Sequence, residues 1–417
     1  MKTTKRILGL ILLLSLILGA IVMTSCSLRF SPAGDSDERG EEEATPPNIY
    51  VTGGDTNNII INTGESPILP AASKALLSTV SLTANFVKAS LVPGFLPDTK
   101  FSQSGSGVIY KLNKDLGEAY IITNYHVIYS DSSSTSSKIS EDISLYLYGM
   151  EADKYKISAK FIGGSMQHDL AVLKVSASPT LISSLATAVT VGDSDDVAIL
   201  DTVIAVGNPD SKGISATVGY VNVDSEEILV SISDNAAPTT LRVMRIDNAI
   251  NRGNSGGGLF NRKGELIGIV NAKNMSGDNM SYAISSNLAK FVADNILYYY
   301  SGTGSSGVIS PDLRLSLVAK ELYVTYDENT GKALRRERVA VSEIARSSAA
   351  YGLLQVGDSI NYITVDGVKY DVTRVFHASE CLLNARAGSE IVYNVTRGDT
   401  TLDLTVKVTS GMLERIQ

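Results

Sequence analysis

The sequence predicts a mainly β protein that ends in a smaller second domain. Short runs rich in Val, Ile and Thr recur between clusters of turn residues, and helical spacing is rare, which is typical of a β-barrel. A Gly/Ser-rich run at 301–307 is the clearest domain boundary in the chain. We therefore expect a large β domain at 71–300, a flexible linker at 301–310 and the smaller domain at 311–417.

Helical patterns in the large domain are confined to its two ends. A short helix is expected from near Ala71 to Leu77, and a longer one follows a cap at Ser286-Asn287 and ends near Tyr299. The alternating segments between them predict strands at 80–87, 105–110, 119–123, 143–148, 156–162, 171–175, 202–206, 217–223, 228–232, 241–246, 266–271 and 281–284.

One glycine-rich stretch, at 251–259, combines a serine with a backbone suited to catalysis. Ser255 sits among glycines, which adopt positive φ and allow close approach of other chains. Such a turn can present a nucleophilic hydroxyl and aim N–H groups at an oxyanion, each worth about 3–4 kcal/mol. The alternative is a glycine-rich hairpin with an incidental serine.

Histidines are scarce, which narrows the choice of a catalytic base. The chain has three histidines, and one of them, His126, ends a β-rich run at a polar corner. A candidate carboxylate, Asp169, begins another apolar run. A serine nucleophile needs a histidine as base and a carboxylate to orient it. Of the other two histidines, His168 is expected to be an exposed neighbour of Asp169, and His377 to be structural.

Several segments together resemble the HtrA (DegP-like) proteases of the chymotrypsin fold. The resemblance covers roughly residues 75 to 410 and departs from the family at Arg252 and Gly258, where proline is common. The matching segments are Thr123-Asn124-Tyr125-His126-Val127, Asp169-Leu170-Ala171-Val172-Leu173, Val191-Gly192-Asp193-Ser194, Ala205-Val206-Gly207-Asn208-Pro209, Ile246-Asp247-Asn248-Ala249-Ile250-Asn251 and Gly253-Asn254-Ser255-Gly256-Gly257.

This resemblance implies a chymotrypsin-like double β-barrel and a serine endopeptidase that acts through an acyl-enzyme, without metal or cofactor. Its catalytic residues would be His126, Asp169 and Ser255, and the N–H groups of Gly253 and Ser255 would form the oxyanion hole. Ala249 and Ile250 would line the substrate pocket and favour small or branched apolar side chains. An inward-pointing Asp247 would instead favour Lys or Arg.

The smaller domain resembles the α/β PDZ domain of HtrA proteases. Strands are expected at 313–324 and 338–341, and a helix, turn and strand at 347–360, followed by 363–367. Such domains bind peptide C-termini at a sheet edge. The loop at 313–316 would capture the carboxylate, although the family's glycine-containing form is absent. The family also implies a homotrimer.

The N-terminus predicts export and attachment to a membrane. Lys2, Lys5 and Arg6 precede an apolar run, and Cys26 follows small residues, as at a bacterial lipoprotein cleavage site. We expect a signal peptide at 1–26 with lipidation of Cys26, favoured over an uncleaved anchor, and a disordered tether at 27–70. Both alternatives place the protein outward-facing in the bacterial cell envelope. Cys381 would then have no disulfide partner and is expected to be a small buried residue.

The overall charge disfavours one class of function. A net charge of −8 and a pI near 5.1 disfavour nucleic-acid binding, which uses a basic face. The resemblance to HtrA proteases implies that the substrates are unfolded or damaged envelope proteins, in protein quality control. The alternative is a catalytically silent scaffold that binds peptides or protein C-termini.

Overall fold

The computed structural model describes residues 68–90, 97–231, 238–271 and 280–416. The expected signal peptide, Cys26 and all but the end of the tether lie outside these residues. Among the residues that are described, no helix has the length and apolarity to cross a membrane. The tether was expected to reach residue 70, but helix α2 (Leu69–Leu77) already begins at Leu69, where Pro70 favours a first helical turn.

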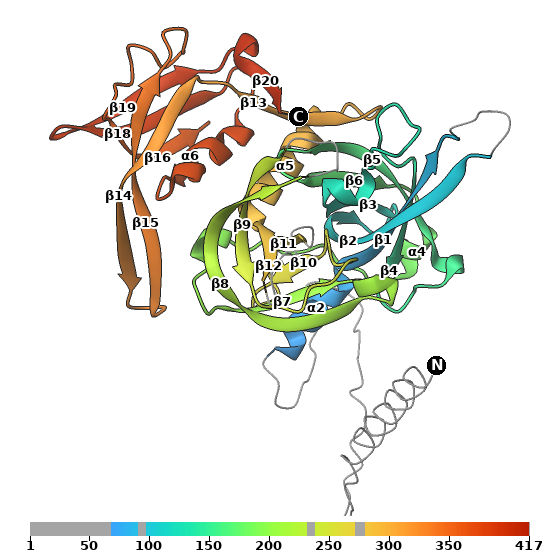
Figure 1. The fold of residues 1–417 in the computed structure, drawn as a ribbon. Coiled ribbons are helices and arrows are strands. Elements are labelled where there is room, and N and C mark those ends of the chain that lie inside the picture. The colour runs from blue at the N-terminus through green and yellow to red at the C-terminus, as the bar shows by residue number, and fades with distance from the viewer. Residues whose placement is uncertain (1–67, 91–96, 232–237, 272–279, 417) are drawn as a thin grey trace, which may run out of the picture. The chain divides into compact units, whose positions relative to one another are not determined.

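The strands of the first barrel are labelled in Figure 1, and they close around an apolar core built from strand residues. Its strands follow the order β5-β4-β1-β2-β3-β6, and β5 also pairs with β6. All these pairings are antiparallel. The bounds are β1 (Thr79–Lys88), β2 (Thr99–Asn113), β3 (Glu118–Thr123), β4 (Asp142–Leu147), β5 (Ile157–Ser165) and β6 (Leu170–Val175).

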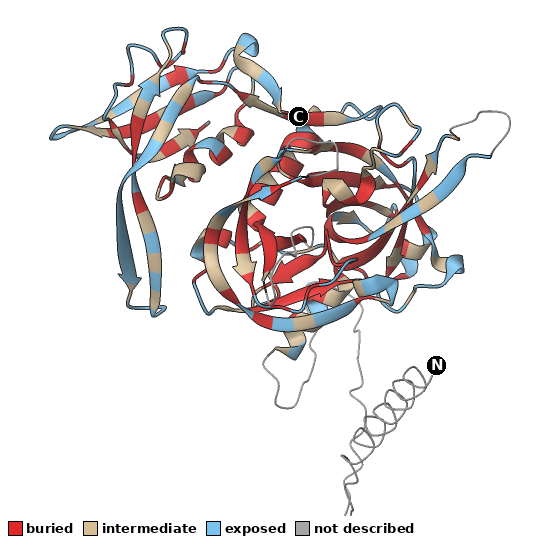
Figure 2. Ribbon diagram, viewed as in Figure 1, coloured by how far each residue is buried: buried red, intermediate tan, exposed pale blue. Residues whose placement is uncertain are grey.

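The second barrel is closed in the order β10-β11-β12-β9-β8-β7. One long strand, β8, spans the region where strands at 217–223 and 228–232 were expected, and two register shifts against β9 absorb the irregular spacing between them. Figure 2 shows buried strands around both barrels. The bounds are β7 (Thr202–Gly207), β8 (Ser215–Val230), β9 (Thr239–Ile246), β10 (Gly258–Phe260), β11 (Leu266–Asn271) and β12 (Ser281–Ser285).

Two successive barrels confirm the chymotrypsin-like double β-barrel. Helix α3 (Tyr125–Ile128) joins β3 to β4 in the first barrel, and helix α4 (Pro179–Ser183) lies in the connection between the two barrels. Helix α5 (Ser286–Tyr299) follows the second barrel and buries one side, including Leu288, Val292 and Ile296, against the core.

The prediction of a flexible linker at 301–310 is wrong for residues 306–310. Residues from Ser306 form strand β13 (Ser306–Pro311), which pairs in parallel with β5 and antiparallel with β20 (Leu413–Ile416). Asn295 of α5 is fully buried and holds this strand through both the N–H and the carbonyl of Ile309. Buried hydrogen bonds therefore outweigh the flexible composition of the segment.

The C-terminal domain is a sheet in the order β14-β15-β16-β18-β19, with β17 paired to β16. Helix α6 (Val375–Glu380) and a 3₁₀ turn at Cys381–Asn384 pack on its core, which includes Cys381 as expected. The strand bounds are β14 (Leu315–Asp327), β15 (Lys332–Ile344), β16 (Ser359–Val365), β17 (Val368–Asp371), β18 (Glu390–Arg397) and β19 (Thr400–Lys407).

The helix expected in the first part of 347–360 is absent, and the chain forms turns there before β16 begins at Ser359. The buried Ser348 hydroxyl donates to the carbonyl of Leu313 and accepts the N–H of Ala350. Serine side chains that bond nearby backbone groups compete with helix formation. The helix α6 was not predicted, because its residues show no helical apolar stripe of useful length.

Candidate active site

His126 is fixed at the corner between β3 and α3. Its backbone N–H donates to Asp169 Oδ1 at 2.9 Å, and its ring Nδ1 lies 2.7 Å from Asp169 Oδ2. The side chain of Asn124, before it, donates to the Asp169 carbonyl at 2.9 Å. One carboxylate therefore holds both the main chain and the imidazole, with Nδ1 as the protonated nitrogen that faces it.

Asp169 has the backbone needed to aim its carboxylate this way. It is fully buried and adopts φ +49°, in the left-handed region, just before β6. A non-glycine residue adopts this conformation at a cost of about 1–3 kcal/mol, and residues strained in this way cluster at functional sites. The side-chain amide of Asn271, at the end of β11, donates to Asp169 Oδ2 at 2.8 Å. Asn271 was not predicted; the one available signal was a polar residue at the end of an apolar strand.

The loop around Ser255 is built on glycines that no other residue could replace. Gly253 has φ +98°, and a Cβ there would lie 2.2 Å from the Asn208 carbonyl oxygen. Gly256 has φ +84°, and its Cβ would lie 2.2 Å from the Ser106 carbonyl oxygen. The close approach explains why this stretch is glycine-rich and argues against an incidental hairpin.

The same contacts bring the three sequence segments together. Gly256, directly after Ser255, lies against Thr123 and Asn124, just before His126. Its N–H donates to the Val270 carbonyl at 2.9 Å, next to the Asn271 that holds Asp169. The Ser255 carbonyl accepts the N–H of Ser106 in β2 at 2.8 Å. Both barrels thus contribute to one site at their junction.

The expected pocket residues lie in different environments. Ile250 is buried and packs in the core of the second barrel, whereas Ala249 is exposed. The Asp247 side chain is also exposed, and it accepts the N–H of Tyr220 at 2.6 Å. Because Asp247 is exposed and bonded to Tyr220, it gives no reason to expect a preference for Lys or Arg. The preference for small or branched apolar substrate side chains stays a prediction. Arg252 is exposed, and Gly258 starts β10, where a Cβ would meet the ring of Phe260.

His168 is not the exposed neighbour that was expected. It is half-buried, and its Nδ1 lies 2.9 Å from the Ser165 hydroxyl. Burial lowers the pKa of His168 to about 4, so the ring is neutral at neutral pH. The side chain packs beside the site and is separate from the His126–Asp169 contact.

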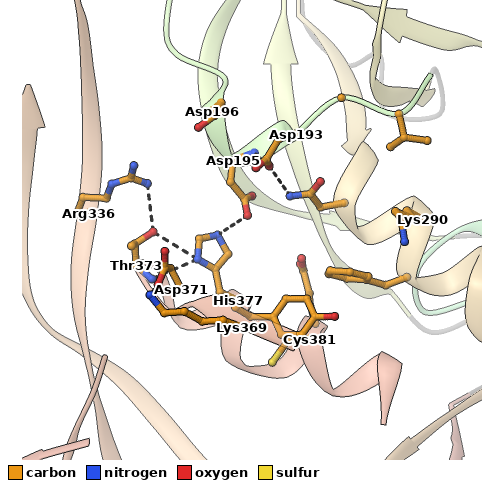
Figure 3. A pocket seen from close by; sticks show the side chains of 16 residues that line it. Asp193, Asp195, Asp196, Lys290, Arg336, Lys369, Asp371, Thr373, His377 and Cys381 are labelled. Atoms are coloured by element: carbon orange, nitrogen blue, oxygen red, sulfur yellow. Dashed lines mark hydrogen bonds and ion pairs between the residues drawn. The ribbon is translucent and has the colours of Figure 1, made fainter. Parts of the chain in front are cut away.

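Away from the candidate active site, a cavity lies between the second barrel and the C-terminal domain. The described residues that line it include no serine nucleophile. The cavity of about 500 Å³ is lined by charges of both signs, including Asp195, Lys290, Arg336 and His377 (Figure 3). Cys381 also lines it, but burial raises the pKa of this thiol to about 12, so no thiolate nucleophile forms at neutral pH.

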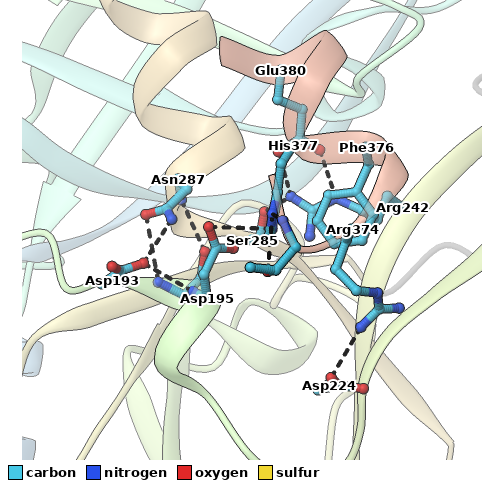
Figure 4. A network of polar contacts seen from close by, with 12 residues as sticks. Asp193, Asp195, Asp224, Arg242, Ser285, Asn287, Arg374, Phe376, His377 and Glu380 are labelled. Carbon is cyan, nitrogen blue, oxygen red and sulfur yellow. Dashed lines mark hydrogen bonds and ion pairs between the residues drawn. The ribbon is translucent and has the colours of Figure 1, made fainter. Parts of the chain in front are cut away.

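A polar network borders this cavity and joins the C-terminal domain to the second barrel (Figure 4). The Arg242 guanidinium of β9 makes two 2.6 Å hydrogen bonds to the two carboxylate oxygens of Glu380 in α6. His377 Nε2 lies 3.3 Å from Asp195, and Arg374 bonds Asp224 at 3.2 Å. These long-range pairs were not predicted, since nothing local in the sequence marks them.

Comparisons with known proteins agree with this geometry. Residues 105–269 match the family model of the trypsin-like peptidase domain. The serine protease Do-like HtrA of Bacillus subtilis is 36% identical over 258 residues, which are 60% of this chain and 51% of that protein. That of Lactococcus lactis subsp. cremoris is 34% identical over 197 residues, 45% of this chain and 43% of that protein. This chain thus spans about half the length, or less, of these relatives.

A solved structure, the HtrA-type protease AlgW with a tripeptide, aligns with 83% of this chain and 97% of its own at 25% identity and a TM-score of 0.49. The matched family segment includes His126, Asp169 and Ser255 together. Residues 105–269 therefore match a trypsin-like peptidase domain, and in sequence the chain is similar to the HtrA serine proteases.

Proposed function

We propose that this chain is an HtrA-type serine endopeptidase, exported and held at the outer face of the bacterial cell membrane. The observation that supports it most directly is the double contact of Asp169 with the ring and the backbone of His126. Acyl transfer requires a histidine oriented in this way and a serine nucleophile, and the glycine loop that carries Ser255 packs against the segment just before His126.

In the proposed mechanism, Ser255 Oγ attacks the scissile carbonyl while His126 takes its proton. Asp169 keeps the proton on Nδ1, so that Nε2 is free to act as the base, and it stabilises the imidazolium that forms. The N–H groups of Gly253 and Ser255 bind the oxyanion. His126 then returns the proton to the leaving amine, and water hydrolyses the acyl-enzyme by the reverse sequence.

The test compares the full chain with its Ser255→Ala variant on casein and with a serine-reactive fluorophosphonate. We expect labelling and hydrolysis by the wild type only, because loss of the nucleophile costs about 10⁶ in kcat. Equal digestion by both proteins contradicts the mechanism. No digestion and no labelling by either supports the alternative of a silent scaffold.

The pocket proposal is tested separately with peptides that vary only at the residue before the cleaved bond. Ala249 and Ile250 offer no charge, so cleavage after Val, Ala or Ile is expected. Cleavage only after Lys or Arg would refute an apolar pocket. We propose unfolded envelope proteins as the natural substrates, because an apolar pocket needs side chains that folded proteins bury.

The C-terminal domain is proposed to be PDZ-like and to bind peptide C-termini. Strand β14 is the edge of its sheet and is exposed along most of its length, which supports addition of an extended peptide. Binding of a peptide with a free carboxylate, and not of its amide, is the expected result. A homotrimer is the proposed assembly, to be measured by sedimentation.

Membrane attachment is proposed to occur through a lipid on Cys26. Labelling of cells with a palmitate analogue should mark the wild type and not Cys26→Ala. An unlabelled wild type that still sediments with membranes would favour the uncleaved anchor.

A further inference from the structure

Within the proposed active site, and resting on that proposal, we infer that Ser106 is a positioning residue for the oxyanion loop. Ser106 lies in β2 of the first barrel and is fully buried. Every polar group it has is bonded to a segment of the site. Its hydroxyl donates to the Gly253 carbonyl at 2.7 Å and accepts the N–H of Asn208 at 2.9 Å. Its own N–H donates to the Ser255 carbonyl at 2.8 Å, and its carbonyl accepts the Thr123 hydroxyl at 2.7 Å.

These bonds determine which way the peptide groups of the loop face. In a trans peptide the carbonyl and the following N–H point in opposite directions. The Arg252 carbonyl accepts the N–H of Asp210 at 2.8 Å, so the N–H of Gly253 points away from that turn. The Gly253 carbonyl is held by the Ser106 hydroxyl, which fixes the next peptide. Gly253 is thus held on both sides.

Glycine makes this restraint necessary. Gly253 has φ +98° and no Cβ, so rotation of its flanking peptides meets little intrinsic resistance. An N–H that must face an oxyanion therefore needs an external bond to keep its direction. Ser106 supplies that bond from the opposite barrel and links it, through Asn208, to the turn that holds Arg252.

The chemistry of the position selects serine. A hydroxyl can donate to Gly253 and accept from Asn208 at the same time, which alanine cannot do and a thiol does only weakly. Space is also limited, since the Ser106 oxygen lies 3.1 Å from where a Cβ on Gly207 would be. Removal of the hydroxyl leaves a carbonyl and an N–H without their partner in the described structure.

The test uses Ser106→Ala in the full chain, with Ser286→Ala as matched control. Ser286 is equally buried, and its hydroxyl donates to the Gly192 carbonyl at 2.8 Å, outside the nucleophile loop. Each variant loses one buried hydroxyl bond to a carbonyl, and Ser106→Ala also loses the bond that the Asn208 N–H donates. We expect Ser106→Ala to lower kcat on a peptide amide about 10- to 100-fold with little change in KM, whereas Ser286→Ala changes neither.

A second measurement separates positioning from a general loss of structure. A peptide aldehyde or boronate, which forms the tetrahedral adduct, should bind Ser106→Ala more weakly by the same factor as kcat/KM. Binding of the product peptide should not change. Ser106→Cys should show intermediate values, and it replaces the alanine variant if that variant does not fold.

Unchanged kcat in Ser106→Ala, a loss confined to KM, or equal effects in Ser286→Ala would overturn the inference. Its failure is distinguishable from failure of the proposed function, because the latter appears as an inactive wild type or as activity that survives Ser255→Ala.

Discussion

Gly253 shows how a single residue decides whether the candidate site can form. Its φ of +98° is accessible to glycine, and a side chain would collide with the Asn208 carbonyl. The two effects are separable, because other glycines with similar φ lie in open space. Gly302 has φ +92° with no atom within 4 Å of a built Cβ.

We therefore predict that Gly253→Ala abolishes most activity while Gly302→Ala does not. The φ penalty of about 1–3 kcal/mol is common to both, but only Gly253→Ala must displace the Asn208–Asp210 turn. A loss of about 100-fold or more in kcat is expected at Gly253 alone. Steady-state kinetics on one peptide substrate, with circular dichroism of both variants, measures it; equal losses would contradict a role for the collision.

The residues of the site differ in how far the sequence reveals them. His126, Asp169 and Ser255 were predicted because each has a short motif around it. Asn271 and Ser106 have no such motif, and their roles depend on hydrogen bonds to residues 102 and 147 positions away. Contacts of this range arise only when the two barrels meet, so no local pattern signals them.

At the scale of elements, the strands followed their alternation closely, and the errors occurred where buried polar contacts override composition. Residues 306–310 were expected to be linker but belong to strand β13, where Asn295 bonds both backbone groups of Ile309. A helix was expected in the first part of 347–360, but the chain forms turns there, because Ser348 bonds the backbone on both sides. Propensity is a weak guide wherever such tertiary bonds form.

The side chain of Asn295 gives a prediction for the stability of these joined elements. Its amide donates to the carbonyls of Ile309 and Leu383 at 2.7 and 2.6 Å, and its oxygen accepts the N–H of Ile309 at 2.9 Å. Asn295→Leu keeps the size but removes the partner of one buried and two partly buried backbone groups. We expect a loss of about 2–5 kcal/mol in the free energy of unfolding.

Urea denaturation measures this loss. The control is Asn85→Leu, which removes an exposed amide bond to Asp142 and should stay within about 0.5 kcal/mol. A change at Asn295 as small as that at Asn85 would mean that β13 is not held by this side chain.

At the scale of the molecule, a buried ion pair joins the C-terminal domain to the second barrel. Arg242 and Glu380 are each 9% exposed, and the guanidinium also lies 3.9 Å from the ring centroid of Phe376. Breaking one partner of such a pair leaves a buried charge, whereas replacing both by apolar residues is often tolerated.

We expect Arg242→Leu to destabilise the chain by about 3–5 kcal/mol and the Arg242→Leu, Glu380→Leu double variant to recover much of the loss. The exposed pair Arg338–Glu321, 3.3 Å apart, is the control and should contribute about 0–1 kcal/mol. Double-mutant cycles in urea give both values. Additive losses at Arg242 and Glu380 would show that the pair is not coupled.

The same interface predicts a dependence on acidic pH. Burial opposes ionisation of Asp195, but the hydrogen bond and charge of His377, with the charge of Arg242, outweigh it and hold the pKa of Asp195 below its usual value. A carboxyl with a depressed folded-state pKa stabilises above its unfolded pKa of about 3.9, and this contribution is lost as pH falls through the lower folded value.

Stability measured from pH 6 downward should therefore fall less steeply in Asp195→Asn than in the wild type below about pH 4. The Asp312→Asn variant, at a more exposed carboxylate, is the comparison. If the stability of wild type and Asp195→Asn falls identically with pH below about pH 4, Asp195 is excluded as the titrating group.

Strand β13 pairs with β5 and with β20, whose last described residue is Ile416. Synthesis from the N-terminus therefore completes both barrels long before the final ladder can form. During that interval the outer border of β13 has no partner, and unpaired borders are where nascent chains associate wrongly. Deletion of β20 would leave that border permanently unpaired, so yield and solubility of the recombinant protein should depend on residues 413–416 more than on any surface loop.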